Sequence, residues 1–193
     1  MQKVTHSEYI AQKKPLAKQL LAKLNEKYQY ASVLITDNYE KGYRASRSGV
    51  AISATNAFGG KGMIVKVYDG KGYAEYSTNE ITAENLPEIE REIEQQLMNP
   101  ATFIPEGTEE AEYKCISDEP CTLCEATDYE IHPREVGDEK LIETVTALRE
   151  KAFKADERIL DAITGFNYQE YHKLFLSANR ELEQSVLYST GIM

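Results

Sequence analysis

Apolar side chains recur at helical spacing near the start of the chain, with lysines between them. The apolar positions are Leu16, Leu20, Leu21, Leu24 and Tyr28. Steps of three and four residues place them on one face, which predicts an amphipathic helix over about residues 15–28. Pro15 is expected in the first turn, where a proline ring is tolerated.

The pattern changes to that of β-strands between Tyr30 and Thr78. Residues 31–35 read ASVLI and are largely apolar on both faces, as in a strand that is covered on both sides. Residues that tolerate positive φ angles follow at Asp37-Asn38, Gly59-Gly60 and Asp69-Gly70. They predict tight turns, and therefore antiparallel pairing between neighbouring strands.

A second helical stripe lies beyond the strands. Its apolar positions are Leu86, Ile89, Ile93 and Leu97. Thr82 or Asn85 can cap the start of this helix, and Asn99-Pro100 is a natural end. The acidic residues between 88 and 94 fall on the other face, where solvation explains them better than a calcium site does.

The last third of the chain divides into a loop, a helix and a hairpin. Residues from about 101 to 137 show no sustained period and predict a long exposed loop that contains the cysteines. From Asp138, apolar residues in steps of four and three predict a helix of about 25 residues that stops before Gly165. The segments 173–177 and 184–188 then read as two strands joined by a polar turn at 179–183.

This order of elements predicts one α+β domain over residues 1–193, in which an antiparallel β-sheet is packed by amphipathic helices. A doubly wound parallel sheet is excluded, because consecutive strands lack the crossover connections that it requires. The hydrophobic content of 41% is enough for a core in a chain of this length.

Charge and cysteine content narrow the functional classes. The formal net charge of -10 argues against nucleic acid as a partner, since binding to phosphates depends on clustered Lys and Arg. No segment approaches the roughly 20 apolar residues of a membrane span, and the first residues do not resemble a signal peptide. Three cysteines within ten residues suggest a reducing compartment, so the expected location is the cytoplasm.

Two stretches carry a resemblance to a known family. They are YASVLITDNYEKGYRASRSGVAIS at 30–53 and GGKGMIVKVYDGKGYAEYSTNEIT at 59–82. Together with the helix that follows, they resemble the N-terminal domain of the TldD/PmbA family, zinc metallopeptidases also described as modulators of DNA gyrase. The strand and turn from Gly62 to Gly70 are the sharpest part of the likeness. A weaker likeness extends over residues 131–160 and 173–190, so it covers most of the chain.

The resemblance implies a role without catalysis for this chain. The family's zinc is bound by an H-E-x-x-x-H helix in a C-terminal metallopeptidase domain, which is absent here. The histidines of this chain, His6, His132 and His172, are far apart, and none begins that motif. The resemblance therefore implies a domain that helps peptides or unfolded proteins reach the zinc site and contributes to a homo- or heterodimer. The chain would then be one piece of a longer protein.

One constellation of residues has the chemistry of a metal site. Cys115, Cys121, Cys124 and His132 offer the thiolate and imidazole ligands that structural zinc prefers, and Cys-x-x-Cys places two sulfurs near one ion. The spacing of the second pair is irregular, however. Ordinary loop cysteines are the more economical interpretation, and a redox-active Cys-x-x-Cys is a third.

Aromatic and basic residues of the strand block suggest a surface for a peptide or a partner protein. These residues are Tyr43, Arg44, Arg47, Tyr68 and Tyr73. Amphipathic rings suit protein contacts, although rings that cover sheet edges and isolated charges on a solvated face are simpler explanations.

A hypothesis from another class is also open. The chain is in that case a stand-alone protein- or peptide-binding module without a peptidase partner, with structural zinc holding the cysteine segment. A continuation of the reading frame into an H-E-x-x-x-H helix would distinguish the two hypotheses.

Overall fold

The computed structural model describes residues 1–54, 60–98 and 113–193. The helices are α1 (Glu8–Lys27), α2 (Leu86–Met98), α3 (Pro133–Val136) and α4 (Asp138–Ala155). The strands are β1 (Gln2–Lys3), β2 (Tyr30–Ser46), β3 (Gly49–Ala54), β4 (Lys61–Tyr68), β5 (Tyr73–Thr78), β6 (Cys121–Ala126), β7 (Asp128–Tyr129), β8 (Thr164–Ser177) and β9 (Arg180–Ile192). Among the helices described, none has the length and apolar character that crossing a membrane requires.

Seven of the strands form one sheet in the order β5-β4-β2-β8-β9-β6, and β3 also pairs with β2. Neighbouring strands are antiparallel, except that β6 lies parallel to β9. β1 and β7 form a separate two-stranded antiparallel pair. The predicted α+β class with an antiparallel sheet is confirmed, and the parallel β6 is a feature that the sequence pattern did not predict.

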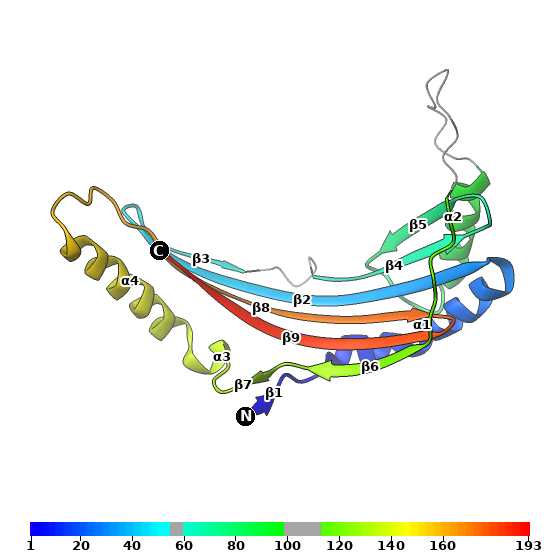
Figure 1. Cartoon of the computed structure of the whole chain (residues 1–193), viewed down its shortest axis with the longest axis horizontal. Helices are drawn as coiled ribbons and strands as arrows, with labels where there is room; N and C mark the ends of the chain where they lie inside the picture. The colour runs from blue at the N-terminus through cyan, green and yellow to red at the C-terminus, as the bar shows by residue number, and fades with distance from the viewer. Residues whose placement is uncertain (55–59, 99–112) are drawn as a thin grey trace, which may run out of the picture.

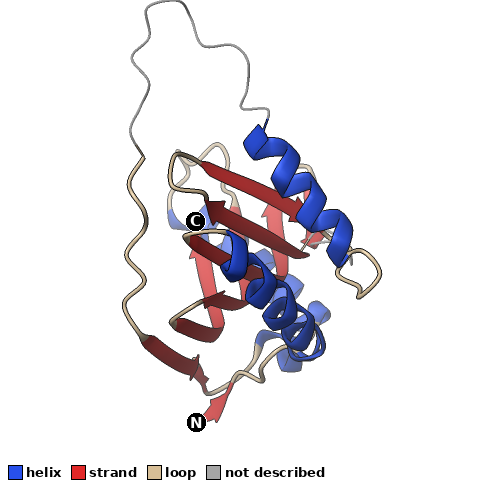
Figure 2. Ribbon diagram, turned by 90° about the vertical axis from the view of Figure 1, so that its right-hand side faces the viewer, coloured by secondary structure: helices blue, strands red, loops and turns tan. Residues whose placement is uncertain are grey.

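The long strands β2, β8 and β9 run as a bowed ribbon between two groups of helices (Figure 1). At one end Val33 and Ile35 of β2 pack in a core with α1 and α2, and at the other Tyr43 and Ala45 pack in a second core with α4. All four are odd-numbered residues of one strand and therefore lie on one face of the sheet. We call this the helix face and the opposite side the open face. Figure 2 shows α1 and α2 on one side and the extended segment before β6 on the other.

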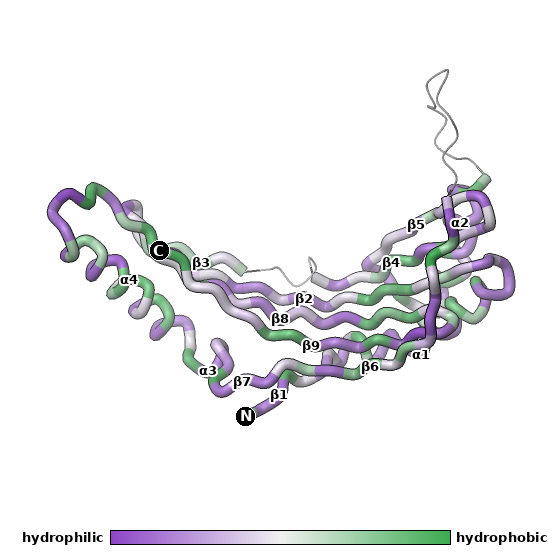
Figure 3. The backbone as a smooth tube through the Cα atoms, in the orientation of Figure 1, coloured by the Kyte–Doolittle hydropathy of each residue, from purple (hydrophilic) through white to green (hydrophobic). Residues whose placement is uncertain are grey.

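The stretch between the two cores is polar. Figure 3 shows that the middle of β2 and β8 is mostly hydrophilic, whereas the end next to α1 is rich in hydrophobic residues. The larger core contains residues of α1, α2 and the sheet, and the smaller one contains Leu141 and Val145 of α4. Polar side chains on the helix face between these cores, including Glu170, His172 and Ser185, are buried and therefore need hydrogen-bonding partners within the protein.

Helix α1 begins earlier than the sequence pattern predicted. Ser7 is its N-cap and accepts a hydrogen bond from the backbone N–H of Ile10 at 3.2 Å. The same hydroxyl donates to Asp37 of β2 at 2.6 Å, which fixes the start of the helix to the sheet. Pro15 consequently lies inside the helix rather than in its first turn. Burial of Ile10 in the core, one turn before Pro15, accounts for the extension.

The turns of the strand block agree only in part with their predicted places. Asp37-Asn38 is not a turn, because β2 continues through it and pairs with β8 along 14 residues up to Ala45. The turn after β2 lies instead at residues 47–48 and precedes Gly49, whose φ is 121°. The Asp69-Gly70 turn is confirmed: it joins β4 to β5, with Gly70 at a φ of 102°. Gly59 and Asn99-Pro100 lie outside the described residues.

The final third departs most from expectation. Part of the predicted loop at 101–137 is regular structure, namely β6, β7 and α3. Helix α4 has 18 residues and ends at Ala155 instead of continuing toward Gly165. Asp156 accounts for the early end, because its carboxylate accepts a hydrogen bond from the backbone N–H of Arg158 at 2.9 Å and so competes with helix continuation. The hairpin strands β8 and β9 are far longer than predicted and are joined by residues 178–179 alone.

Candidate functional site

Two tyrosines of the open face hold an extended segment of the chain. The hydroxyl of Tyr68 donates to the carbonyl oxygen of Tyr113 at 2.7 Å. The hydroxyl of Tyr73 donates to the carbonyl oxygen of Lys114 at 2.8 Å and accepts from the N–H of Ile116 at 2.8 Å. The two rings lie side by side with centroids 4.7 Å apart, because Tyr68 and Tyr73 are paired across the β4–β5 hairpin. Their hydroxyls therefore bind main-chain groups of the segment, and the Tyr73 ring also meets the Tyr113 ring edge-on, with centroids 6.3 Å apart.

Farther along, where the same segment approaches β6, the β8–β9 turn anchors it. The carboxylate of Asp118 accepts from the hydroxyl of Ser177 and from the N–H of Asn179, the latter at 3.1 Å. Arg180 donates through Nε to the carbonyl oxygen of Glu119 at 2.8 Å. We call residues 113–120 the crossing segment. It passes over the open face from β5 to the start of β6 without regular secondary structure.

The other predicted surface residues lie elsewhere. Tyr43 is not on an exposed surface: it is buried on the helix face, and its hydroxyl donates to Asp138 of α4 at 2.8 Å. Arg44 is exposed on the open face of β2, and Arg47 lies in the β2–β3 turn. These two arginines line a cavity of about 510 Å³ with Asp161, at the opposite end of the sheet from the tyrosine pair. The structure thus brings Tyr68 and Tyr73 together, and separately Arg44 and Arg47.

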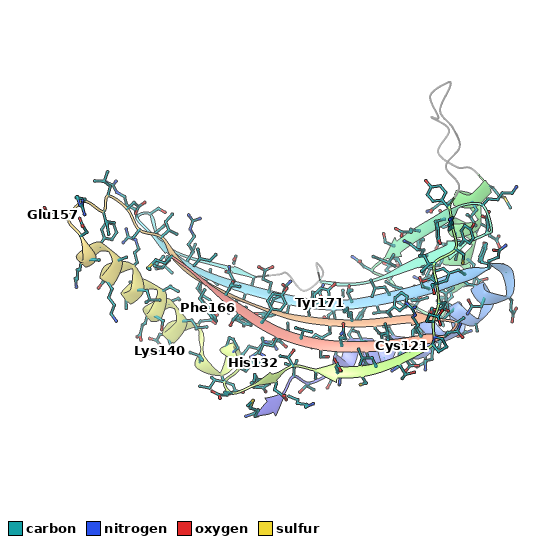
Figure 4. All side chains as sticks on the ribbon, viewed as in Figure 1. Cys121, His132, Lys140, Glu157, Phe166 and Tyr171 are labelled. Carbon is teal, nitrogen blue, oxygen red and sulfur yellow. The ribbon has the colours of Figure 1, made fainter. Side chains whose placement is uncertain are left out.

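The predicted zinc ligands do not converge. Cys121 and Cys124 are three residues apart in strand β6, so their side chains point to opposite faces of the sheet. Cys115 lies in the crossing segment, where its Sγ contacts the carbonyl oxygen of Ile116. His132 caps α3 well away from Cys121 (Figure 4). Within residues 1–54, 60–98 and 113–193, no cluster of three or more His, Cys, Asp or Glu side chains is arranged to hold a metal ion.

His132 is also occupied by protein partners. Its Nδ1 accepts from the N–H of Arg134 at 3.1 Å, and its Nε2 lies 3.5 Å from the carboxylate of Glu170. Neither ring nitrogen is left to coordinate an ion. The residues present therefore do not fit a structural zinc site.

A polar network on the helix face connects all three histidines of the chain. Ser185 Oγ lies 2.9 Å from His6 Nδ1 and 2.9 Å from His172 Nδ1. His172 Nε2 lies 3.7 Å from Glu170, and the same carboxylate is 3.5 Å from His132 Nε2. This network fills the polar stretch between the two cores. The sequence pattern did not predict this network, because His6 and Ser185 are 179 residues apart and no local pattern indicates their contact.

Glu170 is the buried carboxylate of this network. Burial acts to raise its pKa, but the hydrogen bond from His172 and the charge of Arg134 outweigh that effect, so the pKa lies below its ordinary value. Arg134 Nη2 lies 2.6 Å from Glu170 Oε1. The guanidinium of Arg134 also stacks over Tyr39, with Cζ 4.4 Å from the ring centroid. The carboxylate is thus held in its charged form by partners from α3 and β8. This arrangement positions α3 against the sheet.

Comparison with known structures gives the fold an external reference. No protein-family model matches the sequence, and no curated protein matches it. A candidate modulator of DNA gyrase from Thermotoga maritima aligns over 91% of this chain at a TM-score of 0.63 and 16% identity. A second one, from Bacteroides thetaiotaomicron, aligns over 91% at 0.57 and 16% identity. TldE from Thermococcus kodakarensis aligns over 90% at 0.55 and 12% identity.

The chain shares the fold of these proteins. The resemblance to the TldD/PmbA family that the strand block indicated is confirmed in three dimensions. At 12 to 16% identity the likeness concerns the fold alone. The chain spans 38%, 38% and 37% of the length of the three structures.

Proposed function

We propose that this chain is the N-terminal, non-catalytic domain of a TldD/PmbA-like zinc metallopeptidase, and that its open face receives extended peptide. The shared fold supports the kinship, and the fraction of the larger structures that it spans suits one domain of such a protein. The sequence contains no H-E-x-x-x-H motif, so the zinc chemistry would belong to another domain.

One observation carries the peptide-binding part of the proposal. The hydroxyls of Tyr68 and Tyr73 bind two successive carbonyl groups and one N–H of an extended segment, and these hydrogen bonds involve main-chain groups of the segment alone. Main-chain recognition of this kind is tolerant of sequence, as a domain that handles unfolded peptides requires. In this structure the bound segment is the chain's own.

The remainder of the open face offers a continuous path beyond the crossing segment. Tyr171 and Lys173 of β8 project there, and the ammonium of Lys173 lies 5.6 Å from the Tyr171 ring centroid. Tyr188 of β9 is exposed and donates to the side chain of Gln169. Amide, hydroxyl and aromatic groups in a row can contact a polypeptide. An extended peptide can therefore follow β8 from the crossing segment toward Arg44 of the neighbouring β2.

An edge of the sheet supports the assembly part of the proposal. β6 pairs with β9 only from Arg180 to Ser185. Among the described residues, β9 from Val186 to Ile192 has β8 as its one strand partner, which leaves the other edge open. An open edge without proline or lysine is a template for strand addition. A second copy or a related subunit could dimerise there.

Peptide binding is tested by fluorescence anisotropy with a labelled unstructured peptide. The double variant Tyr171→Ser with Tyr188→Ser should weaken binding about thirtyfold, since two aromatic contacts of about 1 kcal/mol each are lost. Leu160→Ser is the control, because Leu160 is 87% exposed in the loop between α4 and β8. Equal affinity of the double variant and the wild type would contradict a peptide path on this face.

Assembly is tested separately by light scattering on the full chain. The proposal predicts a dimer, alone or with a related subunit, and Thr190→Lys should shift it toward monomer by placing charge on the open edge. A strict monomer in both settings would overturn the assembly role and leave the peptide-binding test unaffected.

A further inference from the structure

Cys124 lies at the exposed end of the histidine network. Its Sγ is 3.6 Å from Nε2 of His6, within hydrogen-bonding reach for sulfur. Cys124 is an exposed residue of β6, and His6 lies just before α1 with a side chain that is 37% exposed. A thiol and an imidazole from distant parts of the sequence thus meet at the surface.

The other nitrogen of His6 is oriented by two groups. Nδ1 lies 2.9 Å from Ser185 Oγ and 3.6 Å from the carboxylate of Glu183. A neighbouring carboxylate favours the tautomer that carries its proton on Nδ1, which leaves Nε2 free to accept the proton of the thiol. Lys14 fixes Glu183 through an ion pair of 2.8 Å. Cys124 as nucleophile, His6 as base and Glu183 as orienting group are therefore arranged in the sequence of contacts that activates a thiol.

The two other cysteines provide an internal contrast. Cys121 is exposed but points to the opposite face of β6, and Cys115 contacts the adjacent carbonyl group of Ile116. All three thiols belong to one short region of the chain. Among the described residues, Cys124 alone of the three has an imidazole contact.

A cavity lies beside this thiol. It has a volume of about 310 Å³, and its lining includes Cys124, Ser185 and Lys3. It gives a small molecule room to approach Cys124, and because Lys3 and Glu125 both line it, the cavity selects for neither charge. Exchange between a thiol and a disulfide requires a thiolate, a proton carrier and access to the sulfur. Here Cys124 supplies the thiol, His6 can take its proton, and the cavity gives access to the residue.

We propose that Cys124 and His6 form a nucleophilic thiol site that takes a small disulfide. The thiol proton passes to His6 Nε2, and the Cys124 thiolate attacks one sulfur of the disulfide. A new S–S bond forms, the old one breaks, and the departing thiolate takes the proton from His6. The products are a mixed disulfide on Cys124 and one free thiol, so atoms and electrons balance without another oxidant.

The test is the reaction of the full chain with glutathione disulfide, followed by peptide mass mapping of each cysteine over time. Cys124 should form the mixed disulfide at least about tenfold faster than Cys115 and Cys121. The rates measured in denaturant, where the chain is unfolded, give the intrinsic reactivity of each cysteine, with which its rate in the folded chain is compared. Similar rates for all three cysteines in the folded chain would overturn the proposal.

Variants separate the base from general exposure of the segment. His6→Asn should slow Cys124 about tenfold and leave Cys115 and Cys121 unchanged, while Cys121→Ser should leave Cys124 unchanged. Glu183→Gln, which keeps the size of the orienting side chain, should slow Cys124 by a smaller factor. An undiminished rate in His6→Asn, with its fold verified by circular dichroism, would also overturn the proposal.

Discussion

Tyr43 and Asp138, 95 residues apart in the sequence, are joined by a hydrogen bond of 2.8 Å. Tyr43 belongs to the far half of β2 and Asp138 is the first residue of α4. Lys41 adds an ion pair of 2.7 Å to the same carboxylate. The start of α4 is therefore fixed to the sheet by a buried tyrosine, and the smaller core forms directly beside it.

Replacing Tyr43 by Phe should lower the free energy of unfolding by about 1 kcal/mol, the usual net contribution of one hydrogen bond. The ring stays in the core, so the loss reports the bond to Asp138. Urea denaturation measures it. Tyr188→Phe is the control: its hydroxyl also bonds a side chain, but Tyr188 is 49% exposed, and we expect a smaller loss. Equal losses would contradict the structural role given to Tyr43.

Replacing Tyr73 by Phe should loosen the crossing segment without unfolding the sheet. The variant loses both the hydrogen bond to Lys114 and the one from Ile116, while the ring can still stack on Tyr68. Hydrogen exchange at the amide of Ile116 should accelerate about thirtyfold, as expected when two hydrogen bonds of about 1 kcal/mol each are lost. Tyr171→Phe, on the same face but without a bond to this segment, should leave that rate unchanged.

The behaviour of β2 shows how far the sequence could predict this fold. The apolar residues near Val33 and the Asp69-Gly70 turn were predicted correctly, because each depends on local chemistry. Asp37-Asn38 has the composition of a turn, yet pairing with β8 keeps it extended. Such pairing is a tertiary effect that overrides local preference.

The candidate site shows the same division. Tyr68 and Tyr73 could be proposed from their place in the strands, but their partner, the crossing segment, lies 41 to 45 residues away. Tyr43 is also a tyrosine in an alternating strand pattern, like Tyr68 and Tyr73. It is buried because α4 packs over it, which the strand pattern does not reveal. The cysteine spacing suggested a shared ion, whereas the strand geometry of β6 separates Cys121 from Cys124.

Glu170 should make stability depend on pH in the acid range. Its pKa in the folded state lies below the ordinary value of 4.5. Its contribution to the free energy of unfolding is therefore fully present above pH 4.5 and is lost as the pH falls through the folded-state pKa. Glu170→Gln should lower the free energy of unfolding at neutral pH and flatten its decline between about pH 5 and 2. Urea titrations at several pH values measure both effects, with the exposed Glu157→Gln as control. An unchanged acid slope in Glu170→Gln would contradict this role.

Gly60 has no room for a side chain, whereas Gly72, in the β4–β5 turn, has. A Cβ atom at Gly60 would lie 1.9 Å from the backbone carbonyl oxygen of Asn38, which cannot move without disturbing the bond that Asn38 N–H donates to Gly60 at 2.8 Å. Gly60→Ala should therefore cost about 1 to 3 kcal/mol, the range for overpacking. A Cβ atom at Gly72 would meet nothing within 4 Å, so Gly72→Ala should be neutral or stabilise the chain by a few tenths of a kcal/mol through the unfolded state. Thermal and urea unfolding compare the two variants. Equal stability would mean that Gly60 does not approach β2 as closely as the structure has it.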